Sequence, residues 1–245
     1  MRHLPNRVLA SAALAALTLS GLSACSVVDQ KTFEDDARVS QKITSIRLDS
    51  GNGGVRVVAS ADVSTTSVHR KVDYRGDKPA GTSFSVDNGV LTLSGCGRHC
   101  GVDYVVKVPA SLPVTGGTSN GGVTLTGVGP VDVHTSNGEI AVDGATGPVR
   151  LRTSNGDVRV QGARGGDVDT ETTNGGVTIR TAAPQNIRAR TTSGDLTVTA
   201  PPAGYRISAT DSHGDRKVGF RNDPSGRYRL DLATTNGDLT VQPGG

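Results

Sequence analysis

Two short motifs contain the residue types that could do chemistry. The first is Cys96-Gly-Arg-His-Cys100, whose two thiols and one imidazole are ligands of the kind that zinc accepts. The loop offers no fourth ligand, and cysteines this close in a chain with an export signal are expected to be oxidised. We therefore predict a disulfide between Cys96 and Cys100, with the metal site as the alternative.

The second motif is Asp211-Ser-His-Gly-Asp215, in which two carboxylates flank the imidazole of His213. Such a set could coordinate a metal or act as a general acid and base. The favoured interpretation is that His213 replaces the asparagine of a repeated turn and that both acids are solvated. We predict no metal here and keep Asp211, His213 and Asp215 only as candidates. Arg216 stands where an apolar residue is expected, which predicts a bulge or insertion.

Acidic residues follow the glycine of several repeated turns. If the turns were stacked, the carboxylates would lie a few ångströms apart, and Ca²⁺ accepts such oxygen ligands flexibly. The alternative is that the acids face water and splay apart. We predict no cofactor, and this row leaves Ca²⁺ open. The row comprises Glu139, Asp157, Asp195, Asp215 and Asp238.

These turns belong to a repeat that dominates the second half of the chain. In Thr153-Ser-Asn-Gly-Asp-Val-Arg-Val160, apolar and polar residues alternate after the glycine, as they do before it. Alternation of period two predicts strands with one buried face, and Asn-Gly predicts a sharp corner. Weaker copies surround Gly53 and Gly89. The clear copies recur every 17 to 23 residues, at Gly121, Gly138, Gly156, Gly175, Gly194, Gly214 and Gly237.

Two all-β architectures fit this repeat. Asn-Gly between alternating strands is a hairpin signal, which would give an antiparallel meander. In a parallel β-solenoid, equivalent residues of adjacent coils lie ~4.8 Å apart. The outward residues reverse sign between repeats, so opposite charges would meet along such a stack, and the asparagines would form a ladder. These outward pairs are Asp132 and His134, Arg150 and Arg152, Asp169 and Glu171, and Arg188 and Arg190.

The charge pattern favours the solenoid. We predict a single all-β domain over residues 46–242, a parallel β-solenoid with about seven clear coils. A solenoid needs a cap at its end, because an open strand edge could pair with another chain. The less regular residues 43–101 are therefore predicted to form earlier coils and a cap that the disulfide holds.

The N-terminus has the layout of an export signal. Arg2 and Arg7 precede an uncharged run at residues 8–19, which is too short to span ~30 Å of hydrocarbon. Leu22-Ser-Ala-Cys25 follows and resembles the lipobox of bacterial lipoproteins. The resemblance implies that residues 1–24 are removed and that Cys25 receives a diacylglyceryl group; an ordinary signal peptide is the alternative.

A polar segment follows the proposed lipid site. We predict that residues 25–45 form a flexible tether, with a short helix over residues 33–39 as the alternative.

The order of motifs after the cap resembles the bacterial putative-adhesin family. Val102-Asp-Tyr-Val-Val-Lys-Val-Pro109 and Ala-Ser-Leu-Pro-Val114 precede the Asn-Gly repeats, and the resemblance covers about residues 46–242. It implies an envelope β-solenoid domain of unknown function. It implies no catalytic residues, because none are established in that family.

Composition and motifs narrow the function. The net charge of +3 falls to +1 when Arg2 and Arg7 are removed with the export signal, so there is no basic surplus and we predict no nucleic-acid partner. No catalytic signature indicates an enzyme. We predict a non-enzymatic, lipid-anchored, extracytoplasmic module of the cell membrane that binds a cell-wall polymer or a surface protein. One alternative is a secreted carbohydrate-active β-helix enzyme, which would need converging carboxylates such as Asp211 and Asp215. The other is a sensor of envelope stress.

Overall fold

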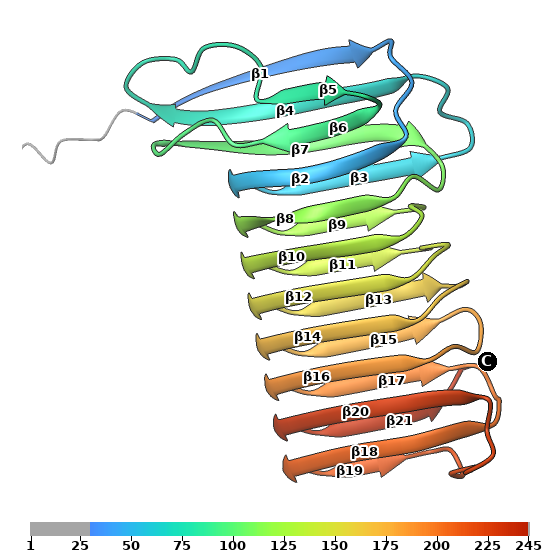
Figure 1. Ribbon diagram of the computed structural model, residues 1–245. Coiled ribbons are helices and arrows are strands. Elements are labelled where there is room, and N and C mark those ends of the chain that lie inside the picture. The colour runs from blue at the N-terminus through green and yellow to red at the C-terminus, as the bar shows by residue number, and fades with distance from the viewer. Residues whose placement is uncertain (1–29, 245) are drawn as a thin grey trace, which may run out of the picture.

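The computed structural model describes residues 30–244, which form two facing β-sheets of eleven and ten strands (Figure 1). The strands stack into a column, in which each coil contributes one strand to each sheet. The thin core between the sheets is made of valine, leucine, isoleucine and alanine side chains. In this part of the chain, no helix is long and apolar enough to cross a membrane.

One coil illustrates the repeated unit. β12 (Val149–Asn155) runs in the ten-stranded sheet, the chain turns at Gly156, and β13 (Val158–Ala163) returns in the eleven-stranded sheet. Alternate side chains point inward on both strands, as the period of two predicts. The buried apolar side chains of this coil are Val149, Leu151, Val158, Val160 and Ala163.

Six further coils have the same form. They are β8 (Val114–Asn120) with β9 (Val123–Thr126), β10 (Val131–Asn137) with β11 (Ile140–Asp143), β14 (Val168–Asn174) with β15 (Val177–Thr181), β16 (Ile187–Ser193) with β17 (Leu196–Ala200), β18 (Tyr205–His213) with β19 (Arg216–Val218), and β20 (Tyr228–Asn236) with β21 (Leu239–Pro243). All these coils are joined by parallel pairing, so the predicted β-solenoid of about seven clear coils is confirmed.

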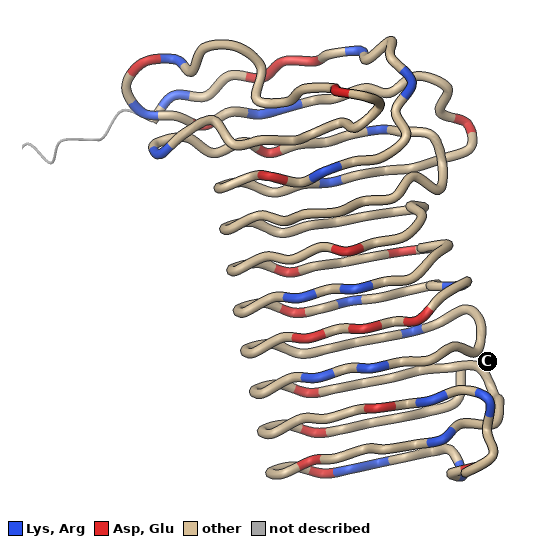
Figure 2. Tube along the Cα trace, viewed as in Figure 1, with Lys and Arg blue, Asp and Glu red and all other residues tan. Residues whose placement is uncertain are grey.

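The register between coils brings opposite charges together. Arg150 pairs with Asp132 in one neighbouring coil and with Asp169 in the other, and Asp169 pairs with Arg188 beyond it. Figure 2 shows the result as rows that alternate between red and blue down the column. The sign alternation therefore correctly predicted the stack, and the antiparallel meander is wrong for these repeats.

The corners are stabilised by ladders that run along the stack. At Gly156 the backbone φ is +156°, and a Cβ there would lie 2.1 Å from the carbonyl oxygen of Gly138, so the corner requires glycine. The buried hydroxyl of Thr153 donates to the same carbonyl at 3.2 Å. Asn155 Nδ2 donates to Asn137 Oδ1 at 2.9 Å, which confirms the predicted asparagine ladder.

The last two coils are exchanged relative to the chain order. β20 lies between β16 and β18, and β21 lies between β17 and β19. The chain leaves the β16–β17 coil, skips one place to build the end coil β18–β19, and returns to fill the gap. The expectation that each copy lies on its predecessor is therefore wrong here, although the register within each pair holds.

The N-terminal part repeats this exchange and adds a cap. The coil of β2 (Ser45–Asn52) and β3 (Val55–Ser60) lies between β8–β9 and the coil of β6 (Val90–Ser94) and β7 (Cys100–Pro109). Beyond β7, β4 (Thr66–Arg75) and β1 (Gln30–Val39) extend the sheet antiparallel, and β5 (Phe84–Asp87) pairs with β6. The predicted early coils and cap are thus present.

Two details of the N-terminal prediction are wrong. Residues 30–39, expected to belong to the tether or to a short helix, form the strand β1. They are held there because alternate residues from Phe33 to Val39 pack against the cap and Asp35 forms an ion pair with Arg70. Gly89 is part of a hairpin between β5 and β6 instead of a coil corner, because Asn88 and Gly89 both have positive φ.

Candidate functional site

Three hollows lie side by side on the outer face of the ten-stranded sheet, where its strands begin. Their volumes are about 610, 450 and 270 Å³. The first two share Arg150, Asp167 and Asp169, and the last two share Arg206 and Arg229, so together they form one open groove across seven coils. We call it the ladder groove.

The floor of the ladder groove follows directly from the repeat. In each coil the residue before the inward side chain in register with Val149 faces this groove, and the register places these residues in one line. From β8 to β18 the line passes from stacked prolines to charged residues. Its members are Pro113, Pro130, Pro148, Asp167, Asn186, Arg229 and Arg206.

Ion pairs between coils occupy the middle of the groove. Arg150 Nε lies 3.6 Å from Asp169 Oδ2, and alongside it Arg152 Nε lies 3.7 Å from Glu171 Oε2. The arginine side chains are about half exposed, so each pair contributes less than about 1 kcal/mol to stability. Their main effect is to fix the direction of the side chains that line the groove.

The acidic row that could hold Ca²⁺ lies at the Asn-Gly corners. Asp157 Oδ1 accepts a hydrogen bond from the backbone N–H of Gly176 at 2.8 Å, and Asp195 Oδ1 accepts one from Asp238 N at 2.9 Å. Asp238 in turn accepts from Asp215 N at 2.9 Å, whereas Glu139 pairs with Arg159. These carboxylates therefore cap backbone N–H groups of the next coil or meet a guanidinium, and the alternative of a Ca²⁺ site stays untested.

The motif with Asp211, His213 and Asp215 lies in the end coil. His213 is in register with Asn236 of the asparagine row, and its Nδ1 lies 3.3 Å from the carbonyl oxygen of Thr235. Asp211 takes the place of the buried threonine, and its Oδ1 accepts a hydrogen bond from His213 N at 3.0 Å. Within residues 30–244, no three potential ligands come close enough to hold a metal ion.

The predicted bulge or insertion is present as an insertion, because residues 219–227 separate β19 from β20, and Arg216 does not mark a bulge in its pairing. It is in register with Leu239 and lies in the inward row, but the inward side of an end coil faces solvent. Its Nη1 donates to the carbonyl oxygen of Ala209 at 2.8 Å and so covers part of the open strand edge. Asn222 Oδ1 accepts from Ile207 N at 2.9 Å on the same edge. The divergent residues of this copy therefore close the stack.

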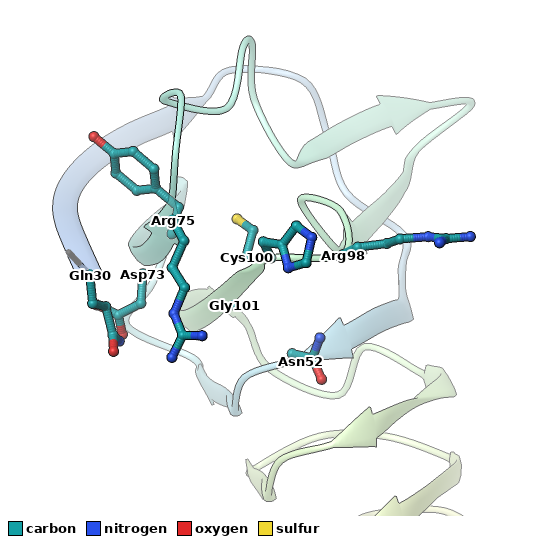
Figure 3. A pocket seen from close by; sticks show the side chains of 9 residues that line it. Gln30, Asn52, Asp73, Arg75, Arg98, Cys100 and Gly101 are labelled. Carbon is teal, nitrogen blue, oxygen red and sulfur yellow. The ribbon is translucent and has the colours of Figure 1, made fainter. Parts of the chain in front are cut away.

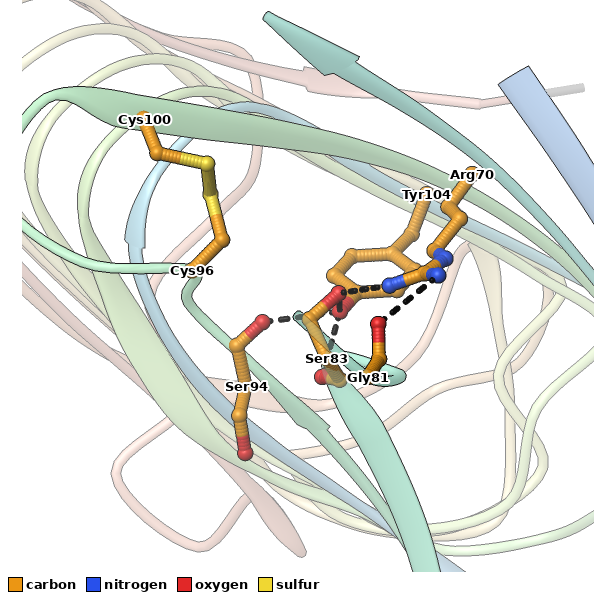
Figure 4. The surroundings of a disulfide bond; sticks show 7 residues. All are labelled: Arg70, Gly81, Ser83, Ser94, Cys96, Cys100 and Tyr104. Carbon is orange, nitrogen blue, oxygen red and sulfur yellow. Dashed lines mark hydrogen bonds between the residues drawn. A yellow bond between two sulfur atoms is a disulfide. The ribbon is translucent and has the colours of Figure 1, made fainter. Parts of the chain in front are cut away.

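The disulfide between Cys96 and Cys100 is confirmed, with a Cα–Cα distance of 5.6 Å (Figure 4). It joins the end of β6 to the start of β7. Near it the buried Tyr104 hydroxyl lies 2.6 Å from Ser83 Oγ and 2.7 Å from the carbonyl oxygen of Ser94, and burial raises the pKa of this tyrosine. Cys96 and Cys100 are thus structural parts of the cap.

A separate hollow of about 320 Å³ lies beside this corner (Figure 3). Arg75 points into it between Asp73 and Asn52, whereas Arg98 points away. Asn52 ends the asparagine ladder here, since its Oδ1 accepts from Asn120 Nδ2 at 2.9 Å. The hollow is polar and open to solvent, and Cys25, the predicted lipid site, lies outside the described residues.

A protein-family model described as Toastrack DUF4097 matches residues 103–243. The chain belongs to this family. The Toastrack match covers all seven repeated coils and most of β7, and it confirms the predicted membership of a family of unknown function.

Comparison with individual proteins adds likenesses of fold. No curated protein matches this chain. A solved structure from Bacteroides fragilis NCTC 9343, described as a putative adhesin, is 14% identical over 89% of this chain and 99% of that chain, with a TM-score of 0.48. One from Clostridium sporogenes ATCC 15579, described as a putative cell adhesion protein, is 12% identical over 87% and 100%, with a TM-score of 0.39. These descriptions apply to those two proteins and assign no function to this chain.

Sequence reasoning missed two residues of the ladder groove, Arg206 and Arg229. Both lie one coil apart at the charged end and line two of its hollows. The available signal was a break in pattern, because the position that carries proline in earlier repeats carries arginine in the last two. The unrecognised exchange of coils hid it, since the neighbours of these residues depend on the stacking order.

Proposed function

We propose that this Toastrack protein is a lipid-anchored, non-enzymatic binding module of the cell envelope, and that the ladder groove holds its partner. The observation that carries the proposal is the continuity of the groove across seven coils. Its residues project from strands that are hydrogen-bonded in register, so they are held in place before a partner arrives. An open, rigid groove suits an extended partner better than an enclosed small substrate.

The position of the N-terminus supports the anchored arrangement. The described chain begins at Gln30 in β1, which lies at the end of the eleven-stranded sheet opposite β19. Residue 30 follows Cys25 by five residues. A lipid on Cys25 would therefore hold the cap near the membrane and direct the groove away from it. A diacylglyceryl group has enough buried methylene groups for stable attachment at ~0.8 kcal/mol each.

The partners of the groove carboxylates support a non-enzymatic role. Glycoside hydrolysis needs two carboxyl groups that are free to act on opposite sides of a bond. In the groove Asp169 meets Arg150, Asp231 meets Arg190, and Asp167 accepts from Asn186. In the described residues Asp132 is the one groove carboxylate without such a partner, so the groove offers no pair of free acids and is suited to contact instead of catalysis.

A binding experiment with the mature protein tests the groove. The Cys25→Ser form, which needs no detergent, would be mixed with isolated cell-wall and membrane fractions, and the bound amount measured. Arg150→Gln with Asp169→Asn removes one ion pair from the groove, and Glu139→Gln with Arg159→Gln removes one from the opposite sheet as a matched control. We expect the groove variant to lose binding and the control to keep it. Equal binding by both variants would overturn the groove as the site.

The anchor is tested separately in cells. Wild-type protein should be recovered with the membranes and should show the mass of a lipid at Cys25, whereas Cys25→Ser should be released. Recovery of both forms from the soluble fraction would contradict lipid attachment.

A further inference from the structure

The charged end of the ladder groove breaks the rule that the rest of the sheet obeys. On the outer face from β2 to β18, Asp, Glu, Lys and Arg residues that are paired with one another on neighbouring strands have opposite signs. Arg206 and Arg229 are the exception, because they are paired directly with each other. Like charges in directly opposed positions destabilise a sheet, so the fold itself does not favour this pair.

Nearby carboxylates leave this end with an excess of positive charge. The outer face of β16, β20 and β18 carries four arginines and the single acid Asp231. Asp231 lies 3.2 Å from Arg190 and 3.9 Å from Arg229. Asp169, on the other side of Arg188, lies beside Arg150. Within residues 30–244, Arg188 and Arg206 thus have no carboxylate within ion-pair distance.

The surrounding surface gives these arginines a concave shape. Arg188, Arg206 and Arg229 line the 450 Å³ hollow, and the last two also line the 270 Å³ hollow, whose far wall is the loop with Asn222 and Pro224. Asn222 fixes this wall, because its Oδ1 accepts the hydrogen bond from Ile207 N at 2.9 Å. The three guanidinium groups therefore belong to one recess that opens into the remainder of the groove.

We propose that Arg188, Arg206 and Arg229 bind the phosphate groups of an anionic polymer of the envelope that lies along the ladder groove. This rests on the proposed function and specifies its ligand. A guanidinium presents a planar fork that can donate two parallel hydrogen bonds to one phosphate group. These arginines can therefore orient a phosphate as well as attract its charge. Because the recess continues into a groove across seven coils, the ligand is a chain instead of a single ion.

The position of the cluster favours a polymer over the protein's own membrane. β18 and β5 are at opposite ends of the ten-stranded sheet, and nine spacings of ~4.8 Å place them ~43 Å apart. Electrostatic attraction is largely screened beyond ~8 Å at physiological salt. A membrane that holds the N-terminal lipid is therefore out of reach of these arginines.

The test uses long-chain inorganic polyphosphate as the probe and the mature Cys25→Ser protein. We expect Arg206→Gln with Arg229→Gln to weaken binding by about tenfold or more, since two charge-assisted contacts are lost. Arg159→Gln with Arg180→Gln removes the same charge from the opposite sheet and should leave affinity unchanged. Binding should also weaken as salt rises from about 50 to about 200 mM.

Three results would overturn the proposal. One is an equal loss in both double variants, which would show attraction by net charge alone. Another is equally tight binding of polyglutamate, which carries carboxylates in place of phosphates. The third is binding to phosphatidylglycerol vesicles, dependent on Arg206 and Arg229, without binding to polyphosphate.

Two further comparisons distinguish a loss of folding from a loss of binding, and failure of the phosphate proposal from failure of the ladder groove as the binding site. Relief of the Arg206–Arg229 repulsion should leave the unfolding temperature of the double variant equal to or above that of the wild type, so a loss of binding cannot be assigned to misfolding. If the groove variant lacking Arg150 and Asp169 loses envelope binding while the arginine variant keeps it, the phosphate proposal fails and the groove stands. If neither double variant affects envelope binding, the groove itself fails.

Discussion

The asparagine ladder offers a quantitative test, because its members differ in the number of bonds they make. Asn155 lies inside the ladder: its Nδ2 donates to Asn137 Oδ1 and its Oδ1 accepts from Asn174 Nδ2, both at 2.9 Å, and its Nδ2 makes a longer, weaker contact of 3.4 Å to the carbonyl oxygen of Ser136. Asn52 lies at the end and only accepts, from Asn120 Nδ2. Both stand at the same corner position, so substitution by alanine changes the local backbone preference equally.

The expected effect follows from this difference. Each hydrogen bond contributes ~1 kcal/mol net, so Asn155→Ala should cost ~2 kcal/mol and Asn52→Ala ~1 kcal/mol. In a domain of this size 1 kcal/mol corresponds to about 2–4 °C, which gives losses of about 4–8 °C and about 2–4 °C. Asn155→Asp should cost more than Asn155→Ala, because a carboxylate would face the Asn137 carbonyl oxygen without a hydrogen to donate.

Calorimetry and urea unfolding of these variants would measure the losses, with the exposed Ser154→Ala as a neighbouring control. The dependence on urea should have the wild-type slope, which shows that the folded and unfolded states are otherwise unchanged. Equal losses for Asn52→Ala and Asn155→Ala, or no loss for Asn155→Ala, would refute the ladder as a source of stability.

Three other substitutions test separate parts of the fold. Gly156→Ala places a Cβ against a backbone carbonyl and should cost ~3 kcal/mol or more in urea unfolding; a cost below ~1 kcal/mol would contradict the tight corner. Asp35→Asn should lower stability by ~2 kcal/mol at neutral pH, because the buried Arg70 guanidinium would lose its carboxylate partner. The Arg70 hydrogen bond lowers the pKa of Asp35 below 3.8, so the cost of the substitution is complete above pH 3.8 and disappears as the pH falls through the pKa of Asp35 in the folded protein. A cost that does not change with pH would refute the ion pair. Cys96→Ser with Cys100→Ser should lower stability by ~2 kcal/mol in thermal unfolding, the chain-entropy value for so short a loop, and an unchanged unfolding temperature would contradict it.

The repeat could be interpreted correctly from sequence because its features depend on nearest neighbours. The opposite signs of Asp132, Arg150, Asp169 and Arg188 have a physical reason only if equivalent positions lie ~4.8 Å apart, and the structure pairs them in that way. The disulfide was predictable for a similar reason, since Cys96 and Cys100 are close in the chain.

The stacking order was not predictable from the same information. Most coils of this solenoid present apolar, threonine and asparagine rows that fit one another, so the repeat fixes the register but not which copy neighbours which. Two signals of the exchange are visible in retrospect. The nine residues between β19 and β20 supply the chain needed to return past the end coil, and the exposed Arg216 at an inward position is tolerated only where one side of the coil is open.

The N-terminal cap was misread because local composition and tertiary pairing disagree there. The polar sequence of β1 indicated a tether, but Asp35 forms an ion pair with the buried Arg70, and Phe33 packs edge-to-face on Tyr74. Both partners lie in β4, more than thirty residues away. Asn88-Gly89 has the same signature as the coil corners and yet forms a hairpin, because a corner and a hairpin turn use the same residues.

Cysteine pairs between coils test the stacked, exchanged arrangement most directly. Arg188 and Asp231 are paired on neighbouring strands, whereas Ser208 lies one coil further along, beyond Asp231. A disulfide needs Cα atoms about 4.4–6.8 Å apart, which fits one spacing of ~4.8 Å and excludes two. In the oxidised, digested protein, mass spectrometry should find the link in Arg188→Cys with Asp231→Cys and not in Arg188→Cys with Ser208→Cys. A link in the second pair alone would show that the coils stack in chain order, and no link in either would contradict the stack.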